Sequence, residues 1–488
     1  MDRLPGAYQG PGGAVAVVRD GTVLARHTWG YANAERRIRF TAQTLVRLCS
    51  ITKQFTCGLV LDAFPDPSVL DGDVRRHLPL LAQAPGALHL CHNQSGLRDY
   101  WALTMLHGAP AESAFGDIES AHIIRGTQTL QFAPGTRYSY CNQNFRILSE
   151  IVAARTGRSY AELLRTRLFD PAGMNAILAA DTRALPDGTE GYEGTQATGF
   201  RPAVNRLIWT GDAGIAASLD DMIAWERWLA DSELYGRLSA PVTFADGNPA
   251  EYGFGLARGR VAGQAITSHG GALRGWRTHR LHVPGERLSV VVLFNHMADA
   301  RAAAMEVLAS LLDLPAPSIA PEHPQRDGAY LEPETGLSVR IDQAGRRLRY
   351  GPSPEILGGT TVLRDGENGL WMDRPQDNQR SLLRRCASPA ARDIAGHYWC
   401  RELDAWLTIA DEGGALYGGF SGALGQGRME ALDPVAADVW ALPCPRAIDH
   451  APPGDWTLDV LRGLGAVKGI TVGCWLAHRL WYEALGSV

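Results

Sequence analysis

Apolar residues near the N-terminus follow the pattern of β-strands. Residues 13–33 are rich in β-branched and aromatic side chains and are divided by Asp20-Gly21, a dipeptide that supplies the positive φ angles of a tight hairpin. The run LSVVVLFN at 288–295 has the same character. This pattern predicts an antiparallel sheet.

Helical periodicity appears between these strands. In residues 50–64 apolar side chains recur every four positions, and Pro65 ends the run, which predicts a helix packed in the core. Residues 144–156 have the same period and end before Gly157, while 218–230 open with a Ser-x-x-Asp sequence typical of a capping box. The chain up to about residue 314 is therefore predicted to be an α/β domain with an antiparallel sheet and helices.

The pattern changes in the last third of the chain. A proline-rich stretch at 314–324 predicts an extended connector. Beyond it, short alternating segments are separated by Gly and Asp-Gly turns, which predicts a mostly β structure. The length fits one large barrel or two small ones, and a dip in apolar content at 387–393 favours two.

Charge and composition exclude several classes of protein. The 488 residues include 47 basic and 52 acidic ones without a basic stripe, so no nucleic-acid partner is expected. No apolar run approaches the length of a membrane span, and the first residues lack a signal peptide, which predicts a cytoplasmic protein without a membrane partner. The eight scattered cysteines are expected to be reduced thiols. No ligand set suggests a metal, and we expect no cofactor.

Lysine is almost absent from the chain. Of the 47 basic residues only Lys53 and Lys468 are lysine, and the others are arginine. Since an arginine side chain does not lose its proton near neutral pH, a lysine kept against this bias is a candidate proton carrier. Lys468 is interpreted as an ordinary surface residue.

Three short motifs carry the candidate chemistry. Ser50 and Lys53 lie three apart at a predicted helix start, where the amine can activate the hydroxyl as a nucleophile. In the loop Tyr140-Cys-Asn142, a tyrosine beside a protonated lysine can ionise well below its usual pKa and act as a base, and Asn142 can bind a substrate amide. His269 is followed by two adjacent glycines next to a predicted strand, and these glycines allow another chain, such as a substrate backbone, to approach the main chain closely. Each motif taken alone also fits a structural role: an N-cap serine, a buried aromatic turn and a structural histidine.

Together the motifs SITK, YCN and HGG resemble the three signatures of the penicillin-recognising serine enzymes, which include class C β-lactamases and DD-carboxypeptidases. Further segments, among them GDAGIAASLDDMIAWE, DVWALP and VGCWLA, extend the resemblance along the chain to the bacterial D-aminopeptidases. The resemblance implies a β-lactamase-like catalytic domain at 1–318, followed by two antiparallel β-barrel domains at 319–388 and 389–488. It also implies a homodimer, possible inhibition by β-lactams, and hydrolysis of peptides, amides or esters with a free N-terminal D-amino acid.

The same resemblance assigns roles to individual residues. Ser50 is the acylated nucleophile, Lys53 its proton partner, and Tyr140 the base that passes protons to the leaving amine. Substrate binding falls to Asn142, His269, Gly271, Ala272 and Asp449. The backbone N–H groups of Ser50 and Ala272 would form the oxyanion hole.

Two features of this assignment bear on specificity. His269 stands where related enzymes have a lysine, so a largely neutral imidazole replaces a fixed cation that would attract a C-terminal carboxylate. Asp449 lies in a proline-rich segment, 445–455, that matches the specificity loop of the family and would pair with the substrate's ammonium group. An ordinary Asp turn is the structural alternative there. The alternative functions are an esterase or D-amino-acid amidase of the same fold, and a penicillin-binding sensor or scaffold without turnover.

Overall fold

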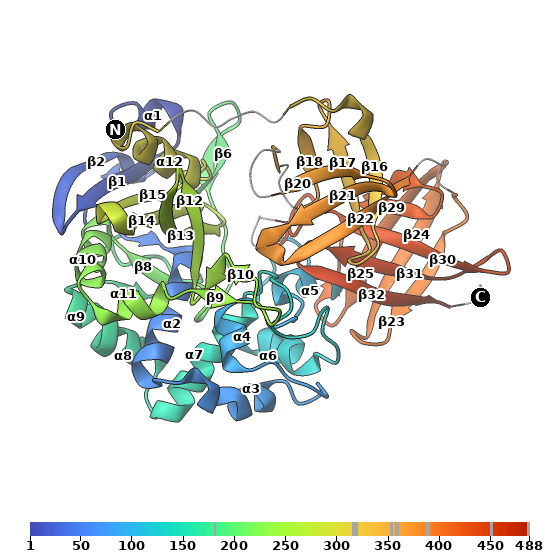
Figure 1. The fold of residues 1–488 in the computed structure, drawn as a ribbon, viewed down its shortest axis with the longest axis horizontal. Coiled ribbons are helices and arrows are strands. Elements are labelled where there is room, and N and C mark those ends of the chain that lie inside the picture. The colour runs from blue at the N-terminus through green and yellow to red at the C-terminus, as the bar shows by residue number, and fades with distance from the viewer. Residues whose placement is uncertain are drawn as a thin grey trace.

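A helix-rich N-terminal part lies beside a C-terminal part made of strands in this computed structural model (Figure 1). The structure describes residues 1–179, 182–314, 321–351, 355–356, 361–386, 391–448 and 452–485. Most of the predicted connector at 314–324 and part of the apolar dip at 387–393 lie outside the described residues. No helix in the described part of the chain combines the length and apolar character needed to cross a membrane.

The N-terminal part is built on an eight-stranded antiparallel sheet in the order β11-β12-β13-β14-β15-β1-β2-β3. Its strands are β1 Gly12–Arg19, β2 Thr22–Asn33, β3 Ile38–Arg39, β11 Tyr252–Gly253, β12 Leu256–Val261, β13 Gln264–Leu273, β14 Trp276–Val283 and β15 Leu288–Phe294. The predicted hairpin joins β1 and β2 through Asp20 and Gly21, both with positive φ. The two segments read as strands from the sequence, β1–β2 and β15, are neighbours in this sheet.

Both faces of the central strands are buried, which explains their almost continuous apolar sequence. Ala14 and Ala16 of β1 belong to the large core cluster that includes Trp225 of the helix α10, Leu219–Ala230. Val15 and Val17, which point the other way, belong to a second cluster with Ala303 of the helix α12, Ala300–Leu311. The sheet is therefore covered by helices on both sides.

Within the described residues, the remainder of the N-terminal part holds three small sheets of two or three short strands and, for the most part, helices (Figure 1). They are α1 Leu4–Ala7, α2 Thr52–Ala63, α3 Asp71–His77, α4 Ala87–Cys91, α5 Tyr100–Leu106, α6 Asp117–Gly126, α7 Gln143–Thr156, α8 Tyr160–Leu163, α9 Asp170–Ala172, α10 Leu219–Ala230, α11 Glu233–Leu238 and α12 Ala300–Leu311. The three predicted helices correspond to α2, α7 and α10. Gly157 ends α7 with a left-handed φ of 68°, and Ser218 caps α10 by accepting the N–H of Asp221.

Helix α2 is more deeply buried than its four-residue period suggests. Every residue from Thr52 to Leu61 is buried, including the polar side chains of Lys53 and Gln54. Phe55 packs on Trp225 with ring centroids 4.1 Å apart. The helix therefore runs through the centre of the domain, and its polar residues need partners inside the protein.

The C-terminal part contains two antiparallel sheets that curl as half-barrels. The seven-stranded sheet has the order β19-β18-β17-β16-β22-β21-β20, with β16 Gly328–Glu332, β17 Leu337–Asp342, β18 Arg347–Arg349, β19 Glu355–Ile356, β20 Val362–Gly366, β21 Gly369–Arg374 and β22 Gln379–Cys386. The ten-stranded sheet comprises β23 Gly396–Cys400, β24 Ala405–Glu412, β25 Ala415–Gly422, β26 Gly425–Gln426, β27 Glu430–Ala431, β28 Asp433–Ala436, β29 Val439–Leu442, β30 Trp456–Gly463, β31 Ala466–Cys474 and β32 Ala477–Ala484. In the described residues no pairing joins the two ends of either sheet. The predicted order of an α/β domain followed by β domains is confirmed, and the exact domain boundaries stay a prediction.

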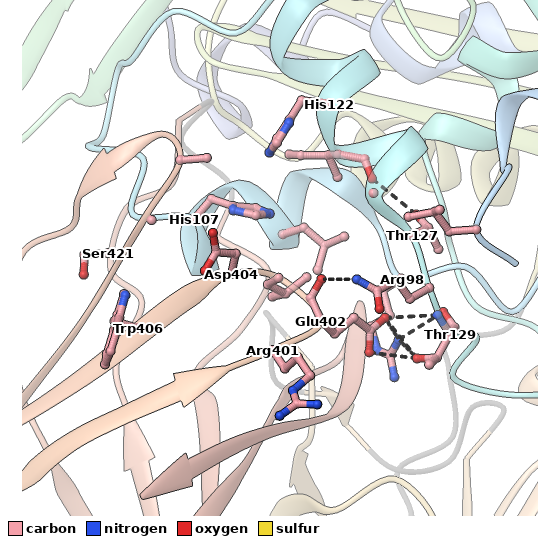
Figure 2. A pocket seen from close by; sticks show the side chains of 18 of the residues that line it. Arg98, His107, His122, Thr127, Thr129, Arg401, Glu402, Asp404, Trp406 and Ser421 are labelled. Carbon is pink, nitrogen blue, oxygen red and sulfur yellow. Dashed lines mark hydrogen bonds and ion pairs between the residues drawn. The ribbon is translucent and has the colours of Figure 1, made fainter. Parts of the chain in front are cut away.

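The ten-stranded sheet is anchored on the helical part by a polar network beside α5. Glu402, in the β23–β24 turn, forms an ion pair with buried Arg98 at 3.3 Å and accepts the hydroxyl of Thr129 (Figure 2). Arg98 also donates to the carbonyl of His478 in β32 at 2.8 Å. These contacts border a pocket of about 690 Å³ between the two parts. They fix the last sheet against the segment that leads into Asp99.

Candidate active site

The predicted motifs meet in one pocket of about 490 Å³ between β13, the α2 start and the loop before α7. Six predicted residues line this pocket: Ser50, Tyr140, Asn142, His269, Gly271 and Ala272. Lys53 lies beneath them and is fully buried. Asp449 lies outside the described residues. The structure thus brings together every predicted site residue that it describes.

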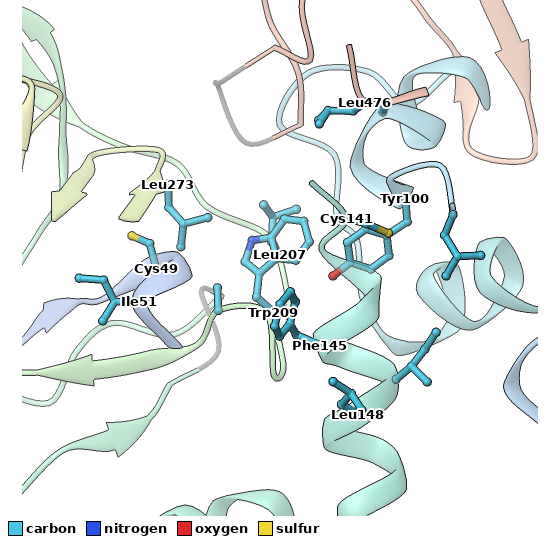
Figure 3. Packing of buried hydrophobic residues seen from close by; sticks show 14 of the residues in the cluster. Cys49, Ile51, Tyr100, Cys141, Phe145, Leu148, Leu207, Trp209, Leu273 and Leu476 are labelled. Carbon is cyan, nitrogen blue, oxygen red and sulfur yellow. The ribbon is translucent and has the colours of Figure 1, made fainter. Parts of the chain in front are cut away.

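Ser50 is held at the start of a helix. A short 3₁₀ turn, Cys49–Ile51, precedes α2, and Cys49 has a left-handed φ of 53°, a strained conformation for a residue with a side chain. Cys49 and Ile51 are both completely buried and pack near Leu273, while the α7 side of the core lies opposite (Figure 3). The apolar neighbours fix the turn, so that the half-buried Ser50 side chain faces the pocket.

The amine of Lys53 has three oxygen partners. Its Nζ lies 3.0 Å from Ser50 Oγ, 2.8 Å from Asn142 Oδ1 and 2.8 Å from the carbonyl oxygen of Asp212. A protonated amine has three N–H donors, so each one is used. The predicted contact between Lys53 and Ser50 is present.

These partners also determine where the lone pair of a neutral amine points. The amide oxygen of Asn142 and the carbonyl of Asp212 can only accept hydrogen bonds, so they take the two N–H groups that a neutral amine retains. Ser50 is the one partner of the three with a proton to donate. Deprotonation of Lys53 therefore turns its lone pair toward the Ser50 hydroxyl, which is the arrangement of a base and its nucleophile.

Burial allows Lys53 to lose its proton near neutral pH. It lowers the pKa of Lys53 to about 8, although the negative charges of Asp212 and Asp99 act in the opposite direction. With this pKa, about a tenth of the amine is neutral at pH 7. An arginine at this position would stay charged.

Two buried carboxyl groups complete the environment of Lys53. Asp99 accepts the backbone N–H groups of Asn142 and Trp101, and burial raises its pKa to about 6. Asp212 accepts the hydroxyl of Tyr100 at 2.6 Å, and burial raises its pKa as well. The sequence analysis missed both residues, because nothing in their local sequence indicates that they lie beside a lysine far away in the chain.

The pKa of Tyr140 differs from the sequence-based expectation. Burial raises it well above its usual value, against the opposing effect of a hydrogen bond with Ser50. The expectation assumed that the lysine charge would dominate, but Nζ of Lys53 lies over the ring face, 4.9 Å from its centroid. Tyr140 is therefore a protonated phenol in the resting site, next to Ser50, and Lys53 is the group that loses its proton more readily.

His269 is neutral, as the sequence analysis expected. Its Nδ1 lies 2.6 Å from the carbonyl of Gly270, so Nδ1 carries the proton, and Nε2 accepts the hydroxyl of Tyr252 at 3.0 Å. Burial and the nearby charge of Lys53 lower the pKa of His269 to about 3. The position thus carries no fixed cation.

Gly271, the second glycine after His269, lets β13 approach the turn before the nucleophile closely. A Cβ on Gly271 would lie 2.1 Å from Oγ1 of Thr278 and 2.3 Å from the carbonyl of Leu48, so only glycine fits. Thr278 also donates to that carbonyl at 2.9 Å, which ties β14 to the turn before Ser50. Ala272, the next residue, is exposed in the pocket.

The ten-stranded sheet contributes directly to the pocket. The turn between β31 and β32 places Trp475 and Leu476 in its wall, together with Trp101 and Trp209 from the helical part. The N–H of Asp99 donates to the carbonyl of Leu476 at 3.0 Å. Trp475 lies in the segment VGCWLA, but its local sequence indicates no role in the site, because the contact between Asp99 and Leu476 joins residues 377 positions apart.

The buried histidines predict loss of stability in acid. Burial lowers the pKa of His269 and of His279 to about 3, so the unfolded chain binds protons below about pH 6.5 that the folded chain does not. The free energy of unfolding should therefore fall as the pH decreases from about 6.5 toward 4, by up to about 1.4 kcal/mol per pH unit for each histidine. Urea unfolding of the wild type and of His279→Gln measures this, and the variant should lose less stability per pH unit. Identical slopes would show that His279 titrates normally in the folded protein.

Comparison with known proteins gives matches along the whole chain. The Beta-lactamase family model matches residues 1–312, and a model described as D-aminopeptidase, domain B, matches residues 320–483. The chain is 57% identical to a D-aminopeptidase of Gluconobacter oxydans, with 99% of this chain and 97% of the relative covered. A D-aminopeptidase of Brucella ovis is 44% identical with the same coverage. Among solved structures, an octameric penicillin-binding protein homologue from Pyrococcus abyssi has a TM-score of 0.56 at 18% identity, covering 86% of this chain and 96% of that one, which shows a shared fold.

Proposed function

Because the chain belongs to the D-aminopeptidases, whose first domain is of the beta-lactamase family, we propose that it removes N-terminal D-amino acids from peptides, amides and esters. The reaction is a serine hydrolysis through an acyl-enzyme on Ser50. The observation that carries this proposal is the contact of Ser50 Oγ with the buried amine of Lys53 at 3.0 Å.

In the first step, Ser50 Oγ attacks the carbonyl carbon of the D-residue, and its proton passes to the neutral amine of Lys53. The lowered pKa of Lys53 supports this role, because the amine can accept and return a proton near neutral pH. The negative oxygen of the tetrahedral intermediate is held by the N–H groups of Ser50 and Ala272. The close approach of Gly271 to the Ser50 turn supports this pairing of donors.

In the second step, the C–N bond breaks and the leaving amine takes a proton from the Tyr140 hydroxyl. Lys53 returns the proton taken from Ser50 to the resulting phenolate, so that the enzyme recovers its charge. Water then attacks the carbonyl carbon of the acyl-enzyme and gives its proton to the same pair of groups. The bond between that carbon and Ser50 Oγ breaks, Oγ takes up the proton from the pair, and the D-amino acid is released. The raised pKa of Tyr140 favours its action as a proton donor rather than as a standing base.

We assign three residues to recognition of the substrate. Asn142 binds the substrate amide through the N–H groups that its Lys53 contact leaves free. His269 is neutral and offers little attraction to a C-terminal carboxylate. Asp449, for which the support is the match of segment 445–455 to the family's specificity loop, pairs with the free α-ammonium group of the substrate.

A panel of three p-nitroanilides tests the function. We expect rapid release of p-nitroaniline from D-alanine p-nitroanilide. The N-acetyl-D-alanine compound should have a kcat/KM at least about thirtyfold lower, since a well-desolvated ammonium–carboxylate pair contributes about 2–4 kcal/mol. The L-alanine compound, which keeps the ammonium group, should be turned over more slowly if the enzyme selects the D configuration. Asp449→Asn should remove most of the preference for the free amine. Equal turnover of the acetylated compound would indicate a general esterase or amidase, and acylation without turnover would indicate a penicillin-binding sensor.

Other properties complete the proposal. We assign domains 1–318, 319–388 and 389–488, a division supported by the separate sheets of the C-terminal part. A cytoplasmic location is supported by the eight cysteines, all of which are free thiols. A homodimer and inhibition by β-lactams rest on the family resemblance alone.

A further inference from the structure

Asp99 is a buried carboxylate beside the site to which the proposed reaction steps give no role. One of its oxygens caps α5 by accepting the backbone N–H of Trp101 at 2.9 Å. The other oxygen accepts the backbone N–H of Asn142, the residue that precedes α7. The positive end of the α7 dipole favours a negative charge at this place. A single carboxylate thus connects the starts of two helices.

The backbone around Asp99 is held from two directions. Its own N–H donates to the carbonyl of Leu476 at 3.0 Å, in the turn of the ten-stranded sheet that forms part of the pocket wall. On the other side, the Gln143 amide donates to the carbonyl of Arg98 at 2.5 Å and accepts the N–H of Tyr100 at 2.8 Å. These contacts are independent of the Asp99 carboxylate, so they remain when that group is changed.

The contact between Asp99 and Asn142 continues to the nucleophile. The amide oxygen of Asn142 accepts the Lys53 amine at 2.8 Å, and Lys53 Nζ lies 3.0 Å from Ser50 Oγ. A chain of three contacts therefore joins the Asp99 carboxylate to the group that attacks the substrate. Asp99 itself does not line the pocket, so it acts on the reaction only through this chain and through its charge.

The charge of Asp99 also acts on Lys53. The titratable groups that face the Lys53 amine are the carboxyl groups of Asp99 and Asp212, the thiols of Cys49, Cys57 and Cys141, the phenol of Tyr140 and the imidazole of His269. Burial raises the pKa of the phenol and of the Cys57 and Cys141 thiols and lowers that of the imidazole, so these groups are uncharged near neutral pH. Burial also raises the pKa of Asp99, to about 6, so this carboxyl is mostly ionised at pH 7 and stabilises the ammonium form of Lys53.

From these contacts we infer that Asp99 is a positioning residue for the reaction, because its carboxylate aligns Asn142 and, through it, the Lys53 amine with the Ser50 hydroxyl. The inference rests on the proposed function, in which Lys53 takes the proton of Ser50. Asp99→Asn keeps nearly the same shape. The amide has only one oxygen, so its NH₂ group must face one of the two backbone N–H groups that the carboxylate binds, and the alignment of Asn142 is weakened.

Lysine NMR tests the effect of the charge without a substrate. The chain has only two lysines, so carbon-13 labelling of lysine gives two side-chain signals, and Lys468→Arg identifies that of Lys53. Loss of a nearby negative charge disfavours an ammonium group. In Asp99→Asn the midpoint of the Lys53 titration should therefore fall by about one pH unit from the wild-type value of about 8.

The matched control is Asp221→Asn. Asp221 is also a buried carboxylate at the start of a helix, and it accepts the backbone N–H groups of Ser218 at 2.8 Å and of Asn175 at 2.6 Å. It does not line the pocket. This variant loses the same kind of hydrogen bond as Asp99→Asn, so it should lose comparable stability and leave the Lys53 midpoint unchanged.

Acylation of Ser50 by p-nitrophenyl acetate tests the alignment. Above the Lys53 midpoint, where the amine is neutral in every protein, the rate constant should be at least about tenfold lower in Asp99→Asn than in the wild type, and within about threefold of it in Asp221→Asn. A merely structural role would lower the folded fraction in both variants and would not move the Lys53 midpoint. Thermal unfolding checks that each variant is folded at the temperature of the assay.

Three results would overturn the inference: an unchanged Lys53 midpoint in Asp99→Asn, a rate constant within about threefold of wild type, or equal losses of rate in the two variants. If the wild type is acylated by p-nitrophenyl acetate but releases no p-nitroaniline from D-alanine p-nitroanilide, the proposed function fails. The lysine titration and the acylation rates then still decide whether Asp99 positions the amine.

Discussion

Ser50→Ala should lower kcat for D-alanine p-nitroanilide by a factor of roughly 10⁴ or more while the protein remains folded. Without Oγ no acyl-enzyme can form, and residual activity would come only from water attacking the bound substrate. Folding should be preserved, because Lys53 keeps its bonds to Asn142 and to the carbonyl of Asp212.

Turnover and intact-protein mass spectrometry measure this effect together. A β-lactam or another serine acylator should add its mass to the wild type and not to Ser50→Ala, with thermal unfolding as the check on folding. Ser310→Ala, on the exposed end of α12, is the matched control and should remain active and acylated. A covalent adduct on the Ser50→Ala protein, or turnover within tenfold of wild type, would rule out Ser50 as the nucleophile.

Lys53→Arg should be the second most damaging substitution, with acylation slowed by roughly 10³-fold. The guanidinium keeps the positive charge but cannot give up its proton, so it cannot take the proton of Ser50. Lys468→Arg provides a control with the same chemical change at the other lysine, which is exposed on β31, and should have wild-type activity.

A second variant separates chemistry from folding at this position. The larger guanidinium must fit where Lys53 has no exposed surface, so Lys53→Arg could also lose stability. Lys53→Met removes the charge and the proton carrier with little change in volume, and it should be as inactive as Lys53→Arg, with circular dichroism as the check that it is folded. Retention of acylation in a folded Lys53→Met protein would show that another group accepts the Ser50 proton.

Local sequence signals predicted the elements that hold the site. The hairpin at Asp20-Gly21, the capping residues Ser218 and Gly157, and the helix that begins after Ser50 all follow from short-range patterns, and the structure confirms them. The scarcity of lysine directed attention to Lys53, which proves to be the buried amine beside Ser50.

Long-range placement could not be obtained in the same way. Asp212 and Trp475 enter the site only because distant segments pack together, and each has an ordinary local sequence. The pKa of Tyr140 was predicted in the wrong direction because burial, which outweighs the charge of Lys53, depends on the complete packing of the pocket. The half-barrel shape of the C-terminal sheets likewise depends on which strands are left unpaired, and this is decided by tertiary contacts.

The pH dependence of Ser50 acylation tests the role of Lys53 most directly. With an acylator that has no titrating amine, the rate constant should rise about tenfold per pH unit below the pKa of Lys53, which is about 8, and level off above it, because only the neutral amine accepts the proton. A rate that is independent of pH in this range, or that keeps rising toward the ordinary lysine pKa of about 10.4, would contradict the account.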